Sequence, residues 1–189
     1  MLYLASQSPR RRALLEQLGL APGLLEVDVP EVRQPGEPAL DYVNRVAREK
    51  AGAGLLEVVA APGARVLAAD TEVILDDVVF GKAADADEAA RMLRALAGRT
   101  HLVCTVVWLV HAGGEASARS LSEVSVTPLS DGDIAAYLAS NEWQGKAGAY
   151  AIQGRAGAFI SHLSGSYSGV MGLPLCETAA LLRANGVTL

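Results

Sequence analysis

The sequence predicts an α/β fold with a mixed β-sheet and flanking helices. Strand and helix patterns alternate along the chain, and no repeat or low-complexity segment interrupts them. Hairpin signals, the clearest being Asp76-Asp77 between two apolar runs, exclude an all-parallel sheet. A length of 189 residues suits one domain spanning 1–189, large enough to bury a substantial core.

The chain begins with an apolar strand at 2–5 that leads directly into a helix at 9–18. Ser8 suits the N-cap of this helix, and Pro9 suits its first position. Leucines recur at helical spacing after them, and Gly19 ends the pattern.

The remaining elements are recognised by apolar runs or apolar periodicity between turn residues. In order, they are a proline-rich connection at 29–38, a helix at 39–52, two strands within 66–80, a helix at 87–97, a strand at 101–110, a short strand at 122–126, a helix at 131–140, an extended glycine-rich segment at 147–160 and a helix at 175–184.

Composition excludes several classes of protein. The formal net charge of −5 argues against a general nucleic-acid binder. No apolar run approaches the roughly 20 residues of a membrane span, and the N-terminus lacks a signal-peptide pattern, so we expect a cytoplasmic protein without a membrane partner. Cys104 and Cys176 show no metal-ligand spacing, which favours two reduced, buried thiols.

Three arginines follow Pro9 in the first turn of the first helix. The helix dipole is positive there, so each cation is unfavourable by roughly 0.3 to 1 kcal/mol unless an anion binds. Backbone N–H groups and guanidinium groups at a helix start suit a phosphate. The alternative is a solvated basic turn. We favour a phosphate site that includes Arg10 and Arg11.

Asp70 and Glu72 interrupt an otherwise apolar strand. Burying an unpaired carboxylate costs several kcal/mol, so an aspartate here usually binds a metal or a cation or has a catalytic task. The alternative is an edge strand with a solvated acidic face. In a regular strand Thr71 points to the opposite face, so Asp70 and Thr71 are expected to reach one ligand only at a bulge or a strand end.

Lysine is rare in this chain. Thirteen arginines accompany only three lysines, at 50, 82 and 146. These positions are candidates for sites that need a compact ammonium group, although three remaining lysines are also compatible with chance.

Gln153 lies among small residues in the glycine-rich segment, where a ligand can approach the backbone. Its amide offers a donor and an acceptor in one plane, which match N3–H and a carbonyl of uracil or thymine. The alternative is a solvent-facing amide. Tyr150 is expected in the core.

Six motifs in order resemble those of Maf-family nucleoside triphosphate pyrophosphatases over the whole chain. They are Leu-Ala-Ser-Gln-Ser-Pro-Arg-Arg-Arg, Ala-Arg-Glu-Lys-Ala, Ala-Asp-Thr-Glu-Val, Leu-Ala-Gly-Arg-Thr-His, Lys-Ala-Gly-Ala-Tyr-Ala-Ile-Gln-Gly and Gly-Leu-Pro-Leu. The resemblance implies an inosine-triphosphatase-like fold with two lobes around a deep cleft, and a homodimer. It also implies a divalent metal, Mg²⁺ or Mn²⁺.

The resemblance assigns roles residue by residue. Asp70 matches the family's proton acceptor and, with Glu31, the metal positions. The phosphate-binding positions are matched by Ser6, Arg11, Lys50 and Lys82. The subfamily that resembles dTTP/UTP pyrophosphatases is matched at Arg10, Thr71 and Gln153. A loop containing Trp143 departs from the family pattern and is expected at the cleft rim.

The function implied is hydrolysis of dTTP and UTP, and of modified pyrimidine nucleotides, to a monophosphate and pyrophosphate in a house-cleaning role. One alternative is a purine triphosphate pyrophosphatase of the inosine type, which Gln153 argues against. Another is a non-catalytic, nucleotide-binding regulator of cell division, which an intact Asp70 argues against.

Overall fold

The computed structural model describes residues 1–189 and confirms the α/β fold with a mixed sheet. The strand order is β2-β1-β3-β5-β6-β7, and β4 pairs with the end of β3. β1 runs parallel to β2 and β3, whereas the other pairs are antiparallel. The elements are β1 (Leu2–Ala5), α1 (Pro9–Gln17), β2 (Gly23–Leu25), α2 (Ala39–Glu57), β3 (Arg65–Leu75), β4 (Val78–Phe80), α3 (Ala86–Leu96), β5 (Thr100–His111), β6 (Gly114–Val126), α4 (Asp131–Leu138), the 3₁₀ helix η1 (Arg155–Phe159), β7 (Ile160–Ser164), α5 (Tyr167–Met171) and α6 (Leu175–Ala184).

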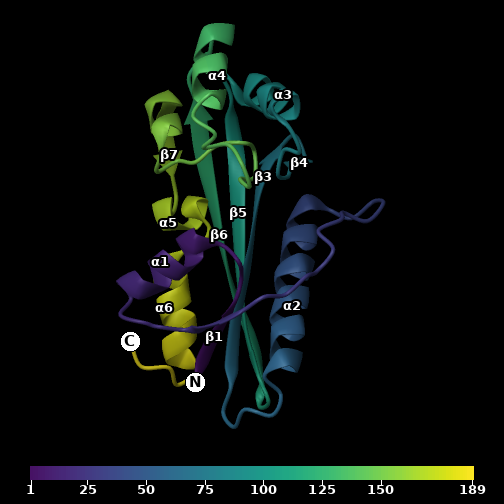
Figure 1. Cartoon of the computed structure of the whole chain (residues 1–189), viewed down its shortest axis with the longest axis vertical. Coiled ribbons are helices and arrows are strands. Elements are labelled where there is room, and N and C mark those ends of the chain that lie inside the picture. Colours follow the sequence, from purple (N-terminus) through teal and green to yellow (C-terminus); the bar gives the residue numbers. More distant parts are fainter.

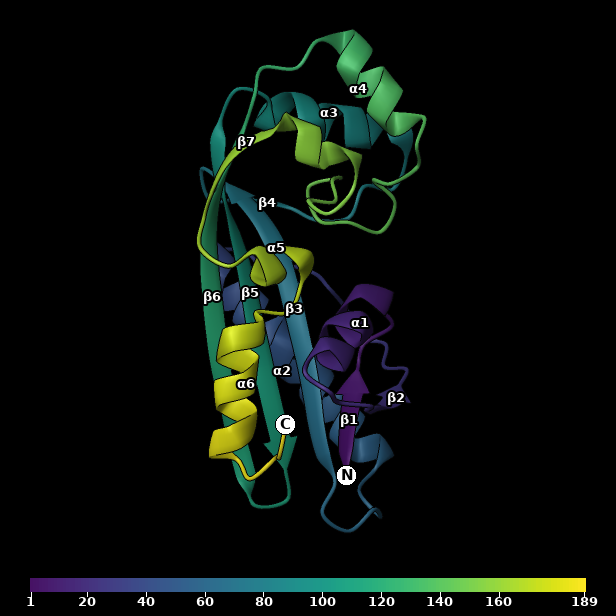
Figure 2. The same cartoon turned by 90° about the vertical axis from the view of Figure 1, so that its left-hand side faces the viewer.

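Three long strands, β3, β5 and β6, run along the long axis of the molecule (Figure 1). Helix α2 covers one face of this sheet, and α1, α5 and α6 lie on the other (Figures 1 and 2). Helices α3 and α4 gather at one end, beside the tip of β3 and β4 (Figure 2). None of the helices combines the length and apolar character that crossing a membrane requires.

Side chains alternate along β3, and this alternation determines which residues lie on each face of the sheet. Ala68 packs in the core beneath α2, and Ala69 packs in the core formed with α1 and α6. Because side chains alternate, Asp70 and Glu72 share the face of Ala68, whereas Thr71 shares the face of Ala69. The two carboxylates and the threonine therefore lie on opposite faces of one strand.

One edge of β3 is open over a short stretch. On this edge β1 pairs with β3 only as far as Leu67, and β4 begins its pairing at Val73. Residues 68–72 therefore lack a strand partner there, although their ladder with β5 on the other edge is regular. The expected bulge or strand end is absent, and this open edge instead makes both faces of β3 accessible from one side.

The hairpin and several helix boundaries agree with the sequence analysis. Asp76 and Asp77 join β3 to β4 with φ values of 53° and 60°, as a two-residue turn requires. Ser8 occupies the N-cap position of α1, but its side chain makes no capping hydrogen bond. Its N–H instead donates to Ser6 Oγ at 3.2 Å.

Two expected element boundaries and one expected conformation were wrong. Helix α2 continues past 52 to Glu57, because Gly54 packs closely on the sheet. Strand β6 begins at Gly114 because it pairs with β5 along nearly its whole length, despite many small polar residues. The segment 147–160 is not extended; it forms turns, one isolated bridge and η1.

The sequence analysis did not predict the short elements β2, β7 and α5. Each has three to five residues, which is too few for a hydrophobic period to be detected. The expectation of two buried thiols was half right, because Cys104 is buried and Cys176 is exposed.

Two glycines of α2 provide a matched test of this packing. A Cβ at Gly54 would lie 2.8 Å from Ala5 Cβ and 2.9 Å from Val66 Cγ1, whereas a Cβ at the exposed Gly52 would meet nothing within 4 Å. We expect Gly54→Ala to destabilise the protein by roughly 1 to 3 kcal/mol through overpacking. Gly52→Ala should stabilise it by about 0.5 to 1 kcal/mol through helix propensity. Urea unfolding measures the change in unfolding free energy of each variant. Equal changes in the two variants would contradict the close packing of Gly54.

His101 provides a test of pH dependence. It is buried, its Nε2 lies 2.8 Å from Tyr150 Oη, and burial lowers its pKa to about 4. The unfolded state, with a pKa of about 6.5, binds more protons between these values. Stability should therefore fall by about 3 kcal/mol as the pH falls from 6.5 to 4.

Urea midpoints at pH 7 and pH 4 would measure this loss. The variant His101→Gln has no titratable group at this position. Its loss of folding stability between pH 7 and pH 4 should therefore be smaller than that of the wild type by about 3 kcal/mol. If the two proteins lose the same stability between pH 7 and pH 4, protonation of His101 does not contribute to the pH dependence.

Candidate active site

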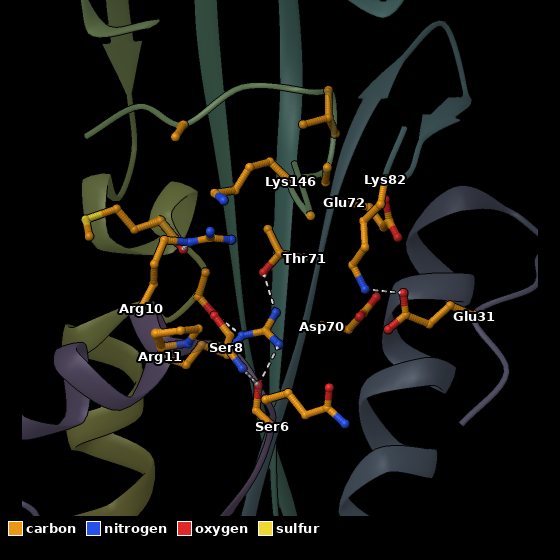
Figure 3. Close-up of a pocket in the computed structure, with 18 of the residues that line it drawn as sticks. Ser6, Ser8, Arg10, Arg11, Glu31, Asp70, Thr71, Glu72, Lys82 and Lys146 are labelled. Carbon is orange, nitrogen blue, oxygen red and sulfur yellow. Dashed lines mark hydrogen bonds and ion pairs between the residues drawn. The ribbon is translucent and has the colours of Figure 1, made fainter. Parts of the chain in front are cut away.

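The open edge of β3 faces a pocket of about 740 Å³ (Figure 3). All nine candidate site residues of the sequence analysis line it. They are Ser6, Arg10, Arg11, Glu31, Lys50, Asp70, Thr71, Lys82 and Gln153. The walls come from the β1–α1 connection, the segment before α2, β3, the segment 144–153 and the end of α5.

Two lysines hold two carboxylates on the α2 side of β3. Lys50 Nζ donates to Asp70 Oδ1 at 2.7 Å and to Glu31 Oε1 at 2.6 Å. Lys82 Nζ donates to Glu31 Oε2 at 2.7 Å (Figure 3). Burial raises the pKa of Glu31, but the hydrogen bonds from both lysines outweigh it and lower the value to about 2. Glu31 is therefore an anion between two cations.

Asp70 and Glu72 are 4% and 5% exposed. Asp70 Oδ2 and Glu72 Oε2 are buried and have no hydrogen-bond partner. Burial, followed by the negative charges of Asp70 and Glu31, raises the pKa of Glu72 to about 8. The sequence analysis did not assign Glu72 a role in the site, although its two-residue spacing from Asp70 signalled a shared face.

Arg11 connects α1 to the other face of β3. Its Nε donates to Gly172 O at 2.8 Å, and its two terminal nitrogens donate to Ser6 Oγ at 3.3 Å and Thr71 Oγ1 at 3.0 Å (Figure 3). Burial lowers the pKa of Arg11, and the charge of Asp70 partly opposes this. The guanidinium is thus fixed in position before any ligand binds.

Thr71 connects the Arg11 guanidinium to the neighbouring strand β5 through hydrogen bonds. Thr105 Oγ1 donates to Gly169 O at 2.7 Å, so the hydrogen of the 2.8 Å contact between Thr71 and Thr105 must come from Thr71. Thr71 Oγ1 therefore accepts from Arg11. The hydrogen bonds run in one direction, from α1 through β3 and β5 to α5.

A second pair of cations has no carboxylate partner. Arg10 Nε donates to Met171 O at 3.3 Å, and Lys146 Nζ donates to Gln144 O at 2.8 Å. Their side chains extend toward one another across the pocket, from α1 and from the segment 144–153 (Figure 3). Lys146 was singled out by the scarcity of lysine, but the family motifs assigned it no role.

The segment 144–153 also supplies Gln153, whose exposed side chain makes no hydrogen bond with the protein. Tyr150 is buried as expected, at 8% exposure. The expectation for Trp143 was wrong. It packs in the core with Ile134 and Tyr137 and does not line the pocket, because its large apolar ring is buried beneath α4.

The carboxylates are compatible with a divalent cation. No three histidine, cysteine, aspartate or glutamate side chains are grouped to hold a metal by themselves. Mg²⁺, however, usually takes one or two carboxylates together with waters and substrate phosphates. Glu31 and Asp70 already hold a cationic ammonium group between them, and Asp70 Oδ2 is a hard oxygen donor without a partner.

Comparison with known proteins identifies the family of this chain. The profile of the Maf-like protein family matches residues 1–185. A dTTP/UTP pyrophosphatase of Xanthomonas euvesicatoria pv. vesicatoria is 59% identical over 188 residues, covering 98% of this chain and 99% of the relative. A nucleoside triphosphate pyrophosphatase of Xylella fastidiosa (strain 9a5c) is 58% identical over 183 residues, covering 96% and 97%. This protein belongs to the Maf family.

Proposed function

We propose that this protein hydrolyses dTTP and UTP to the nucleoside monophosphate and pyrophosphate. The observation that carries the proposal is a pocket with two chemically different sides. On one side Asp70 has a buried carboxylate oxygen without a partner, and on the other side cations lack counter-ions. The activities named for the relatives from Xanthomonas and Xylella support the same reaction.

Asp70 is the proposed general base. Lys50 binds Oδ1 and fixes the side chain, which leaves Oδ2 free to accept a proton from water. The water oxygen then forms a bond to the α-phosphorus. The bond from this phosphorus to the bridging oxygen breaks, and its electron pair leaves with pyrophosphate.

Negative charge grows on the leaving group during this step. The proposed phosphate-binding residues are Arg11 in α1, Ser6 in the connection before it, Lys50 and Lys82. Because Arg11 is held by three hydrogen bonds, its charge needs little reorganisation when the substrate reacts. Electrostatic stabilisation of a transition state requires a charge that is held in place in this way before the reaction.

Base selection is proposed for Gln153, with Arg10 and Thr71 shaping the pocket. The free amide of Gln153 can accept from N3–H of uracil or thymine and donate to an adjacent carbonyl. Guanine presents two adjacent donors, N1–H and N2–H, and an amide has one acceptor oxygen to meet them, whereas a carboxylate has two.

Glu31 and Asp70 are the proposed ligands of a divalent metal, Mg²⁺ or Mn²⁺. Such an ion, when bound, would neutralise phosphate charge and polarise the α-phosphoryl oxygen. We also propose that the chain acts as a single domain with two lobes, forms a homodimer and works in the cytoplasm on free nucleotides.

The reaction is tested by product analysis across a nucleotide panel. We expect metal-dependent release of pyrophosphate, with UTP and dTTP favoured over ATP, GTP and inosine triphosphate. The variant Asp70→Asn should lower kcat by about 10²- to 10⁴-fold, because it removes the base. Orthophosphate as the sole product, or turnover that survives chelation, would refute the mechanism.

Two controls accompany Asp70→Asn. The thermal midpoint checks that the loss of the Lys50 ion pair has not unfolded the protein, and binding of a non-hydrolysable UTP analogue checks the pocket. A folded variant that keeps more than about a tenth of the wild-type rate would make Asp70 a structural residue.

Base selection is tested with Gln153→Glu, which removes the amide donor and adds a charge that repels a pyrimidine carbonyl. The value of kcat/KM for UTP should fall about ten- to a hundredfold, and that for GTP should fall less. Gln144→Glu is the matched control, because Gln144 lines the same pocket on the same segment and its side chain makes no hydrogen bond. If the ratio of kcat/KM for UTP to kcat/KM for GTP stays at the wild-type value in both variants, Gln153 does not select the base.

A further inference from the structure

We infer that Lys146 binds the β- and γ-phosphates of the substrate, the part that leaves as pyrophosphate, and that Arg10 contacts the same phosphates besides shaping the pocket for base selection. The inference rests on the proposed function, since it assigns one part of that substrate to one part of the pocket. It adds a binding residue from a segment that faces α1 across the pocket (Figure 3).

The first argument is the pairing of the lysines. Lys50 and Lys82 form ion pairs with Glu31 or Asp70 at 2.6 to 2.7 Å. Lys146 forms none, and its ammonium group uses one donor on the carbonyl of Gln144. Of the three lysines, it alone has no carboxylate that must be displaced before it binds an anion.

The second argument is the proximity of two like charges. The pKa of Lys146 is lowered by burial and then by the charge of Arg10, and the charge of Glu142 opposes this only in part. The pKa of Arg10 is lowered by burial and then by Arg11. Part-buried cations that repel one another are stabilised by an anion between them, and a phosphate group can accept hydrogen bonds from both.

The third argument is that the backbone around Lys146 is ordered. Ala147 forms a bridge with Lys82, and Gly148 N donates to Phe80 O at 2.7 Å. Gly148 has a φ of +66° and lies so close to Val73 that a Cβ would approach its side chain to 2.8 Å. The lysine therefore extends from a segment fixed against β3 and β4, so little order must be gained on binding.

The charge distribution then indicates which phosphates these cations bind. The α-phosphate must lie beside Asp70, where water attacks. The paired lysines near Asp70 are already largely neutralised by Glu31 and Asp70. The two remaining phosphates carry most of the charge of the substrate, and Arg10 and Lys146 carry the charge without a counter-ion.

The test compares Lys146→Gln with wild type in calorimetric titrations with inorganic pyrophosphate, with UMP, and with a UTP analogue that has a methylene group between the α- and β-phosphorus atoms. Glutamine retains a donor for the carbonyl of Gln144 but lacks the charge. We expect pyrophosphate and the analogue to bind about ten- to a hundredfold more weakly. UMP should change less than about threefold.

Arg12→Gln is the matched control. Arg12 is also on α1 and carries the same charge, but it is exposed, pairs with Glu16 at 2.9 Å and does not line the pocket. It should leave the affinities for pyrophosphate and UMP unchanged. Comparable weakening in Arg12→Gln would attribute the effect of Lys146→Gln to net charge alone and overturn the inference.

Two other results would also overturn it. Unchanged affinity for pyrophosphate in Lys146→Gln would show that the lysine does not bind this group. Equal weakening of UMP and pyrophosphate would place it at the α-phosphate or the base. Failure of the proposed function is distinguishable, because wild-type protein would then release no pyrophosphate from any nucleotide in the panel.

Discussion

The open edge of β3 between Leu67 and Val73 is the constraint on which the site depends. A strand with partners on both edges presents its two faces to two separate layers, and side chains on opposite faces cannot share a ligand. Here the parallel partner ends early and the antiparallel partner begins late. A ligand in the pocket at this edge can reach Asp70 on one face and Thr71 on the other. The pocket therefore depends on the short length of β1 as much as on the identity of any side chain.

The two faces then receive different electrostatic environments from the layers that cover them. Helix α2 supplies Lys50 to the face that carries Asp70, and ammonium and carboxylate groups neutralise one another there. Helix α1 supplies Arg11 to the face that carries Thr71, and hydroxyl and carbonyl groups receive its hydrogen bonds. Charges on one face are thus paired with one another, and the guanidinium charge on the other face has no carboxylate partner.

Much of this arrangement could be predicted from the sequence because it is local or chemically unusual. Asp76-Asp77 specified a hairpin, and Asp70 was conspicuous as a charge within an apolar strand. The access of both Asp70 and Thr71 to one pocket could not be predicted, because it depends on where β1 and β4 end. The continuation of α2 through Gly54 was missed for a similar reason, since close packing on β1 and β3 overrides a weak helix propensity. Glu72 and Lys146 also line the pocket. The spacing of Glu72 from Asp70 and the scarcity of lysine drew attention to them, but a role in the site depends on tertiary placement that these signals do not contain.

The hydrogen bonds from α1 to the end of α5 and the residue after it have a consequence for the order in which the pocket can form. Arg10 and Arg11 donate to the carbonyl groups of Met171 and Gly172, each 161 residues further along the chain. These contacts join residues distant in sequence, so they form only once the segment that carries Met171 and Gly172 has packed against α1. A chain shortened before residue 171 would keep Asp70 but lack the carbonyl groups that orient both guanidinium groups. The arrangement of these two guanidinium groups is thus coupled to the docking of the end of α5 and the residue after it against α1, which is far away in sequence.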